Sequence, residues 1–185
     1  MEGLIRDGFI TGVLDSTTTE LADELVGGVL SAGPDRLEIA GALGIPQVVS
    51  VGALDMVNFG PAESVPERFA GRQFVKHNAT VTLMRTTPAE NAELGRIIAR
   101  KLSAARGPVT LFLPLRGVSA IDVEGQPFRD EAADRALFAT LRAGLGPNVT
   151  LREIDTDINA PAFAVAMADE LHALYAARVP ASAAR

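Results

Sequence analysis

Short runs of apolar residues alternate along the chain with stretches in which apolar residues recur every three or four positions. A short apolar run is typical of a buried strand, and the longer spacing is typical of a helix with one buried face. The apolar runs predict strands at Phe9–Leu14, Pro46–Ser50, Val81–Met84, Val109–Leu113 and Val149–Ile154. The helical spacing predicts helices around Leu21–Val29, Pro34–Leu43, Ala89–Ala105, Ala132–Leu145 and Pro161–Tyr175. The segment Gly52–Pro66 is expected to be mostly loop.

Strands that alternate with helices in this way are typical of an α/β fold. We expect a single Rossmann-like, three-layer domain with one mostly parallel sheet. In that sheet the strands near residues 10–14, 46–50, 109–113 and 149–154 lie side by side. No internal repeat or shift in composition indicates a linker, so one domain is expected over residues 1–185, with its core at about 4–175. Residues 179–185 are expected to form a frayed tail.

Composition narrows the class of protein. The chain has 185 residues, of which 48% are hydrophobic and 22% are charged, so it is too apolar to be intrinsically disordered. It has no cysteine, which excludes a disulfide framework, a thiolate nucleophile and a cysteine-ligated metal site. The 17 basic and 23 acidic residues give a net charge of −6, which argues against a broad nucleic-acid surface.

The apolar runs also bear on location. None of them approaches the roughly 18 residues that a membrane span needs, and the first residues lack a signal-peptide pattern. We therefore expect a soluble, cytoplasmic protein that has no membrane partner.

Ligands of open parallel sheets bind beyond the carboxyl ends of the strands, which directs attention to the segments that follow the predicted strands. No phosphate-binding P-loop, dinucleotide fingerprint or nucleophile elbow is present there. Asp155, Asp157 and Asn159 resemble the start of a calcium loop. However, Ala160 and Ala166 stand where such a loop needs glycine and glutamate, so no metal site is predicted.

Three threonines, Thr17, Thr18 and Thr19, follow the first predicted strand and open a helix. Backbone N–H groups at a helix start attract anions, and the hydroxyls add donors, so these residues could hold a phosphate. Thr17 and Glu20 also have the spacing of a capping box, which needs no ligand. Capping is the more economical explanation, and both remain open.

Arginines and small residues at other strand ends are further candidates for phosphate binding. Arg36 follows Gly33 near a predicted helix start, where it needs an anion, either Asp35 or a bound phosphate. Arg116 emerges from the most buried strand beside Gly117, which predicts either a ligand or a carboxylate partner such as Asp122. The remaining predicted contributors of the same loops are Ser50, Gly52 and Ser119.

Few residues could transfer protons. His77 lies in a polar stretch and has the right ordinary pKa for a general acid or base, although a lone loop histidine is more often structural. Asp122 is the other candidate for proton transfer.

Five blocks of sequence resemble a known family, that of the tomato mosaic virus resistance protein. The blocks are Ser16–Arg36, Gly52–Gly60, His77–Asn78, Thr82–Thr87 and Leu113–Ser119, and the resemblance extends from Leu4 to about Leu174. Family members carry another α/β domain of similar size before this one, and their ATP binding is attributed to the two-domain unit. The resemblance therefore implies a C-terminal domain, with the N-terminal α/β domain as its partner, ATP as the ligand and Mg²⁺ accompanying the nucleotide.

The preferred hypothesis is the C-terminal half of an ATP- or nucleotide-binding protein, whose loops bind phosphate in an interdomain cleft. One alternative is an enzyme that acts on a small phosphorylated or carboxylated metabolite, with His77 or Asp122 as proton carrier and Arg116 as anion clamp. Another is a structural half that assembles with the N-terminal domain. We also expect a homo-oligomer or an exposed apolar patch at Val51–Phe59, which contains Met56, Val57 and Phe59.

Overall fold

The computed structural model describes residues 1–178, and its centre is a four-stranded parallel sheet. The strands run in the order β1-β2-β6-β7, all parallel to their neighbours. This arrangement confirms the four strands that were predicted to lie side by side. Their bounds are Val13–Thr17 for β1, Gln47–Gly52 for β2, Val109–Pro114 for β6 and Val149–Ile154 for β7.

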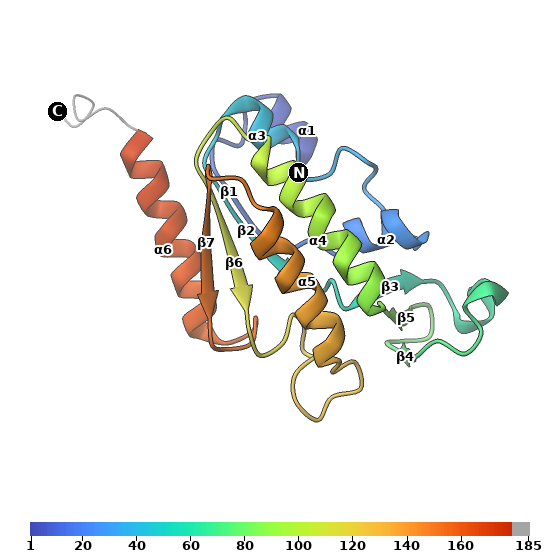
Figure 1. Cartoon of the computed structure of the whole chain (residues 1–185). Helices are drawn as coiled ribbons and strands as arrows, with labels where there is room; N and C mark the ends of the chain where they lie inside the picture. The colour runs from blue at the N-terminus through green and yellow to red at the C-terminus, as the bar shows by residue number, and fades with distance from the viewer. Residues whose placement is uncertain (179–185) are drawn as a thin grey trace.

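Helices cover both faces of this sheet and make three layers (Figure 1). On one face lie α4 (Pro88–Ser103) and α5 (Glu131–Gly144), which pack closely together. On the other face, α6 (Pro161–Arg178) contacts β1, β2 and β6. The shorter helices are α1 (Glu2–Arg6), α2 (Glu20–Val26) and α3 (Ile39–Leu43).

The alternation of side chains along β2 and β6 builds a core on each face of the sheet. Val49 and Leu111 belong to the large core with α4 and α5, whereas Val48 and Phe112 pack with α6. The ring of Phe112 meets that of Phe163 on α6 edge to face, with centroids 6.0 Å apart. The fold class predicted from the sequence, a Rossmann-like α/β domain, is thus confirmed.

A second, antiparallel sheet departs from the prediction of one sheet. Its order is β3-β5-β4, formed by β3 (Met56–Phe59), β4 (Phe74–Lys76) and β5 (Thr82–Arg85). The 3₁₀ turns η1 (Ala62–Ser64) and η2 (Glu67–Phe69) lie between β3 and β4.

This second sheet contradicts the prediction of an exposed patch at Val51–Phe59 for Val57 and Phe59, whereas Met56 is half-buried. Val57 and Phe59 are 0% and 2% exposed, because β3 pairs with β5 and turns these side chains into the main core. The Phe59 ring also packs against Phe69, with centroids 5.4 Å apart. The expected loop is therefore partly strand, and Val51, Leu54, Val57 and Phe59 belong to the domain's own core.

Two predicted boundaries also shift for local reasons. β1 begins at Val13 rather than Phe9, and the Phe9 side chain is 79% exposed. The predicted second helix begins at Ile39 rather than Pro34, since Leu37 has a φ of +76°, which no α-helix accommodates. The predicted frayed tail at 179–185 lies outside the described residues. Among residues 1–178, no helix is both long enough and apolar enough to cross a membrane.

Candidate functional site

A cleft of about 380 Å³ lies at the carboxyl ends of the parallel strands, beside the first turns of α6. This is the place at which open α/β sheets bind ligands. One side of the cleft is apolar, and its large side chains are Leu14, Ile158, Phe163 and Met167. The other side is polar or small, and its residues include Ser16, Thr17, Gly52, Ser119 and Asn159.

Gly52 lets two strand ends approach each other at the cleft. A Cβ atom at this position would collide with the carbonyl oxygen of Ser16 and lie 2.7 Å from the Ile158 side chain. The register of β1 against β2 shifts just before this point, between Asp15 and Thr17. Glycine is thus required here by close packing, and the cleft wall consists of backbone.

Ser16 and Thr17 lie on the exposed rim of the cleft, and their hydroxyls form no hydrogen bond with any described residue. The carbonyl oxygen of Thr17 accepts a bond from Arg36 at 3.3 Å. Both hydroxyls are therefore free to donate to a ligand.

The other hydroxyls of the predicted phosphate site are already engaged. Thr18 is buried and donates to the carbonyl of Ser50 at 3.2 Å, and Ser50 donates to the carbonyl of Phe112 at 3.0 Å. Thr19 accepts a bond from the Asn58 amide at 3.2 Å. The predicted capping box of Thr17 is wrong, because Thr17 still belongs to β1 and the N-cap of α2 is Thr19, which makes no side-chain cap bond.

Arg36 has neither of its predicted partners. It is 5% exposed and binds both carboxylate oxygens of Asp15, at 2.5 and 2.8 Å, with Glu20 at 3.5 Å. Its donors therefore hold β1 in place rather than a ligand or Asp35. Gly33 lies in the turn before Arg36, donates its N–H to the Ser31 hydroxyl at 3.0 Å, and does not line the cleft.

Arg116 also pairs with a residue other than the predicted one. It is exposed and binds both oxygens of Asp155, at 2.7 and 2.6 Å, rather than Asp122. The hydrogen bonds and charge of Arg116 hold the pKa of Asp155 below its ordinary value. Arg116 lines a separate polar hollow of about 400 Å³, and Gly117 next to it has a φ of +142° with Val123 packed closely against it.

The proposed proton carriers and anion clamp do not come together. His77 is exposed at the turn between β4 and β5, while Asp122 is fully buried. Asp122 accepts bonds from Arg85 at 3.1 Å and from the backbone N–H of Val118 at 2.9 Å. The structure therefore does not assemble His77, Asp122 and Arg116 into one catalytic site.

A buried charge cluster that the sequence did not indicate surrounds Arg85. Its guanidinium lies 2.9 Å from Asp134 on α5 and 3.1 Å from Asp122, and Arg129 binds the second oxygen of Asp134 at 2.6 Å. Burial raises the pKa of Asp122 to about 6, and burial together with the charge of Asp122 raises the pKa of Asp134 to about 7. This cluster ties β5 and α5 to the loop that follows β6.

Asp55 connects the buried region to the cleft. Its Oδ2 accepts a hydrogen bond of 2.7 Å from the hydroxyl of Ser119, which lines the cleft. Its Oδ1 is buried and has no hydrogen-bond partner among the described residues. Burial raises the pKa of Asp55 to about 6, against the lowering effect of the Ser119 bond. Asp55 was not among the site residues predicted from the sequence; a lone carboxylate in the apolar run around Leu54 is the signal that could have indicated it.

Comparison with known proteins assigns the family. Residues 1–175 match the model described as "Uncharacterised protein family (UPF0261) C-terminal domain". The chain belongs to the UPF0261 family. This confirms the resemblance found in the sequence, although the match says nothing of ATP. Within residues 1–178, no group of three or more histidine and carboxylate side chains could hold a metal ion.

Relatives of the UPF0261 family come from bacteria and from a plant. A UPF0261 protein of Clostridium tetani is 58% identical over 172 residues, which are 92% of this chain and 43% of that protein. One from Rhizobium meliloti is 49% identical over 168 residues, 90% of this chain and 42% of that protein. The ToMV resistance protein Tm-1(GCR237) of Solanum lycopersicum is 45% identical over 171 residues, 91% of this chain and 23% of that protein. The chain thus spans less than half the length of these relatives.

Proposed function

We propose that this domain binds the phosphate groups of a nucleotide such as ATP in the cleft, as one wall of a site that an N-terminal domain completes. The observation that carries the proposal is the cleft at the carboxyl ends of β1 and β2, where Ser16 and Thr17 present unused hydroxyls beside the Gly52 backbone. Hydroxyls and backbone N–H groups are the donors that phosphate oxygens accept.

The loop after β6 supplies further donors. This loop contains a turn that two hydrogen bonds stabilise. Asp122 donates its N–H to the carbonyl of Ser119, and Ile121 donates its N–H to the Ser119 hydroxyl. The N–H groups of Ser119 and Ala120 donate to no acceptor in the part of the chain that the structure describes. These two N–H groups border the cleft and would bind an anion without help from a cationic side chain.

The dimensions of the cleft favour a shared site. Its volume of about 380 Å³ is near the lower end of the roughly 300–1,000 Å³ found for ligand pockets. The hydroxyl side would take the phosphates, and the apolar side with Phe163 and Met167 would take part of the sugar or base. A Mg²⁺ ion would arrive on the phosphates and keep most of its waters, since Mg²⁺ needs few protein ligands.

Calorimetric titration of the chain with MgATP, and with inorganic phosphate as a minimal probe, tests the proposal. Ser16→Ala and Thr17→Val each remove one free hydroxyl, so affinity should fall about 3- to 10-fold per lost bond while the melting temperature stays unchanged. Thr150→Val is the matched control, because Thr150 is an exposed strand residue that lies outside the cleft. Equal affinity in all three variants, or ligand density elsewhere in a crystal, would refute the site.

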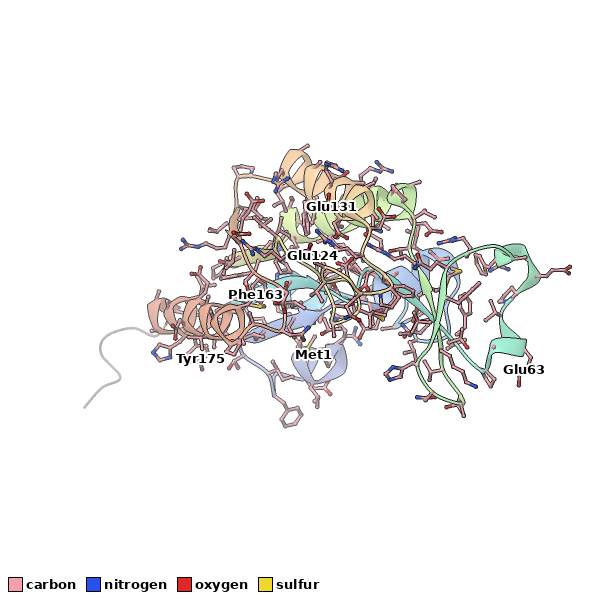
Figure 2. The ribbon with its side chains drawn as sticks, turned by 90° about the horizontal axis from the view of Figure 1, so that it is seen from below. Met1, Glu63, Glu124, Glu131, Phe163 and Tyr175 are labelled. Carbon is pink, nitrogen blue, oxygen red and sulfur yellow. The ribbon has the colours of Figure 1, made fainter. Side chains whose placement is uncertain are left out.

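A second candidate function is assembly with the N-terminal domain, and the character of α6 favours it. Helices that are apolar on all sides are normally buried. α6 carries apolar residues around most of its circumference, but only Phe163 and Met167 are buried, whereas Val165 and Tyr175 are 58% and 43% exposed. Figure 2 shows α6, labelled at Phe163 and Tyr175, on the far side of the molecule from Glu63.

An apolar groove continues this surface. It has a volume of about 550 Å³ and runs between α6 and residues 9–12, and Leu14 of the edge strand β1 lines both the groove and the cleft. We propose that the N-terminal domain of the longer relatives covers the groove, since those relatives devote more than half of their length to residues outside this match.

Hydrogen–deuterium exchange tests this assembly. In this chain the α6 surface is open, so residues 161–178 should exchange faster than the matching segment of the full-length Clostridium tetani protein. Equal exchange in the two proteins would contradict coverage by the N-terminal domain. Protection in this chain through dimers that Val165→Asp dissociates would show that another copy covers the groove.

A further inference from the structure

We propose that Asp55 is a positioning residue that couples anion binding in the cleft to the uptake of one proton, through the hydroxyl of Ser119. The inference rests on the proposed function, because it concerns the same cleft. Asp55 is fully buried directly behind Ser119, and Ser119 is the residue that connects Asp55 with the cleft. Asp55 itself does not line the cleft, so it would act only through this neighbour.

The hydrogen bonds of Ser119 carry the argument. A serine hydroxyl has a single proton, and here it is donated to Oδ2 of Asp55 at 2.7 Å. The hydroxyl oxygen of Ser119 accepts the N–H of Ile121 at 3.2 Å. While Asp55 is ionised, Ser119 therefore offers only a lone pair to the cleft, and a lone pair repels an anion. Once Asp55 is protonated, it donates its own proton to the oxygen of Ser119. The Ser119 hydroxyl can then turn and donate its hydrogen bond to the ligand.

The charged groups around Asp55 have opposing effects on the ionisation of its carboxyl group. Arg85 on β5 favours the ionised carboxylate, whereas Asp134 on α5 and Asp122 in the loop after β6 favour the neutral acid. Arg129 offsets part of the charge of those two carboxylates. The unpartnered Oδ1 adds to the cost of keeping a charge there.

A bound anion can therefore change the protonation state of Asp55. Burial brings the pKa of Asp55 to about 6, so the carboxyl is mostly ionised at pH 7.5 but is readily protonated. An anion in the cleft adds negative charge near Asp55 and raises its pKa further. By linkage, protonation of Asp55 must then increase the affinity for the anion by the same factor.

Titration with inorganic sulfate tests the coupling, because sulfate keeps the same charge between pH 5.5 and 7.5. We expect up to one proton to be taken up per bound sulfate at pH 7.5, measured calorimetrically in buffers of different ionisation enthalpy. Affinity should fall up to about tenfold between pH 6.5 and 7.5, which is the limit for one linked proton.

Variants test whether Asp55 is the group that takes up the proton. Asp55→Asn should abolish the proton uptake and flatten the pH profile. If that variant fails to fold, Ser119→Ala, which removes the hydrogen bond but leaves the effect of the anion's charge on Asp55, should reduce both. His77→Gln and His172→Gln are the controls, since both histidines are exposed and should leave the profile unchanged. A purely structural Asp55 would change stability but not the number of protons taken up.

The outcomes distinguish the inference from the function on which it rests. Sulfate binding without proton uptake, or with proton uptake that persists in both Asp55→Asn and Ser119→Ala, would overturn the role of Asp55 and leave the anion site standing. Absence of binding at every pH, for sulfate, phosphate and MgATP alike, would overturn both.

Discussion

Arg85 joins parts of the domain that are far apart in the sequence. Its guanidinium contacts Asp122 and Asp134, 37 and 49 residues away, and its Nε donates to the carbonyl of Phe128 at 2.7 Å. Only 4% of Arg85 is exposed, so these bonds replace the water that the charge has lost. A buried pair of this kind contributes little net stability, but removing one member leaves the other charges uncompensated.

Replacement of Arg85 should therefore be severe. Arg85→Met keeps the apolar stem of the side chain but removes the cation that Asp122 and Asp134 share, which leaves Asp134 with Arg129 alone. We expect the free energy of unfolding to fall by about 3–5 kcal/mol. Urea unfolding followed by circular dichroism measures this change. Arg152→Met is the control, because Arg152 forms an exposed pair with Glu170 at 3.5 Å and should cost less than about 1 kcal/mol. Similar losses in the two variants would contradict the structural role of the cluster.

Among the secondary-structure elements, length decided what the sequence could predict. α4, α5, β6 and β7 agree with the predicted ranges to within one or two residues, because long helical periodicity and uninterrupted apolar runs are strong signals. β3 and β4 have four and three residues and gave no such signal.

Part of the candidate site could likewise be predicted from the sequence and part could not. The rule that ligands bind beyond the carboxyl ends of parallel strands placed Thr17, Gly52 and Ser119 on the cleft, and their role in binding stays a prediction. The partners of Arg36 and Arg116 could not be predicted from neighbours in the chain. Asp15 and Asp155 lie 21 and 39 residues away, and only the packing of the sheet brings them near.

The two helix starts give an element-scale prediction. Thr87 caps α4 in a full capping box with Glu90, whereas Thr17 caps nothing. Thr87→Ala should therefore lower the free energy of unfolding by about 0.5–2 kcal/mol, and Thr17→Ala should leave it within about 0.5 kcal/mol. Chemical denaturation of both variants under one set of conditions makes the comparison. A larger loss for Thr17→Ala would restore the capping role that the sequence suggested.

The whole molecule is built unevenly about its main sheet. The strand order follows the chain order, and three parallel crossovers in the same direction place their helices on one face. The other face is left to α6 (Figure 1), whose buried residues are Phe163 and Met167. The single helix α6, the groove and the cleft all lie on this side of the sheet.

Global stability should depend on pH in an unusual direction. The pKa values of Asp55 and Asp122 are raised to about 6 and that of Asp134 to about 7, so the folded state binds protons more tightly than the unfolded state. Their contribution is greatest near pH 4 and is lost as the pH rises to about 7. Below this window Glu90 acts in the opposite sense, because bonds from Arg72 and Thr87 outweigh its burial and lower its pKa.

Urea unfolding between pH 5 and pH 7.5 measures this dependence. We expect the free energy of unfolding to be higher at pH 5, and Asp134→Asn should make the difference between the two pH values smaller. A free energy of unfolding that rises steadily from pH 5 to pH 7.5 would contradict the raised pKa values of the buried carboxylates.

Leu14 lines both the cleft and the groove, so a ligand and a neighbouring domain would meet at this residue. Under the proposed function the two events would be coupled, because closing the groove would shield the ligand and the ligand would add contact area for the closing domain. A ligand bound in the cleft should then slow the separation of the two domains as well as occupying its own site. Domain opening, rather than diffusion through an open pocket, would govern how quickly the ligand enters and leaves.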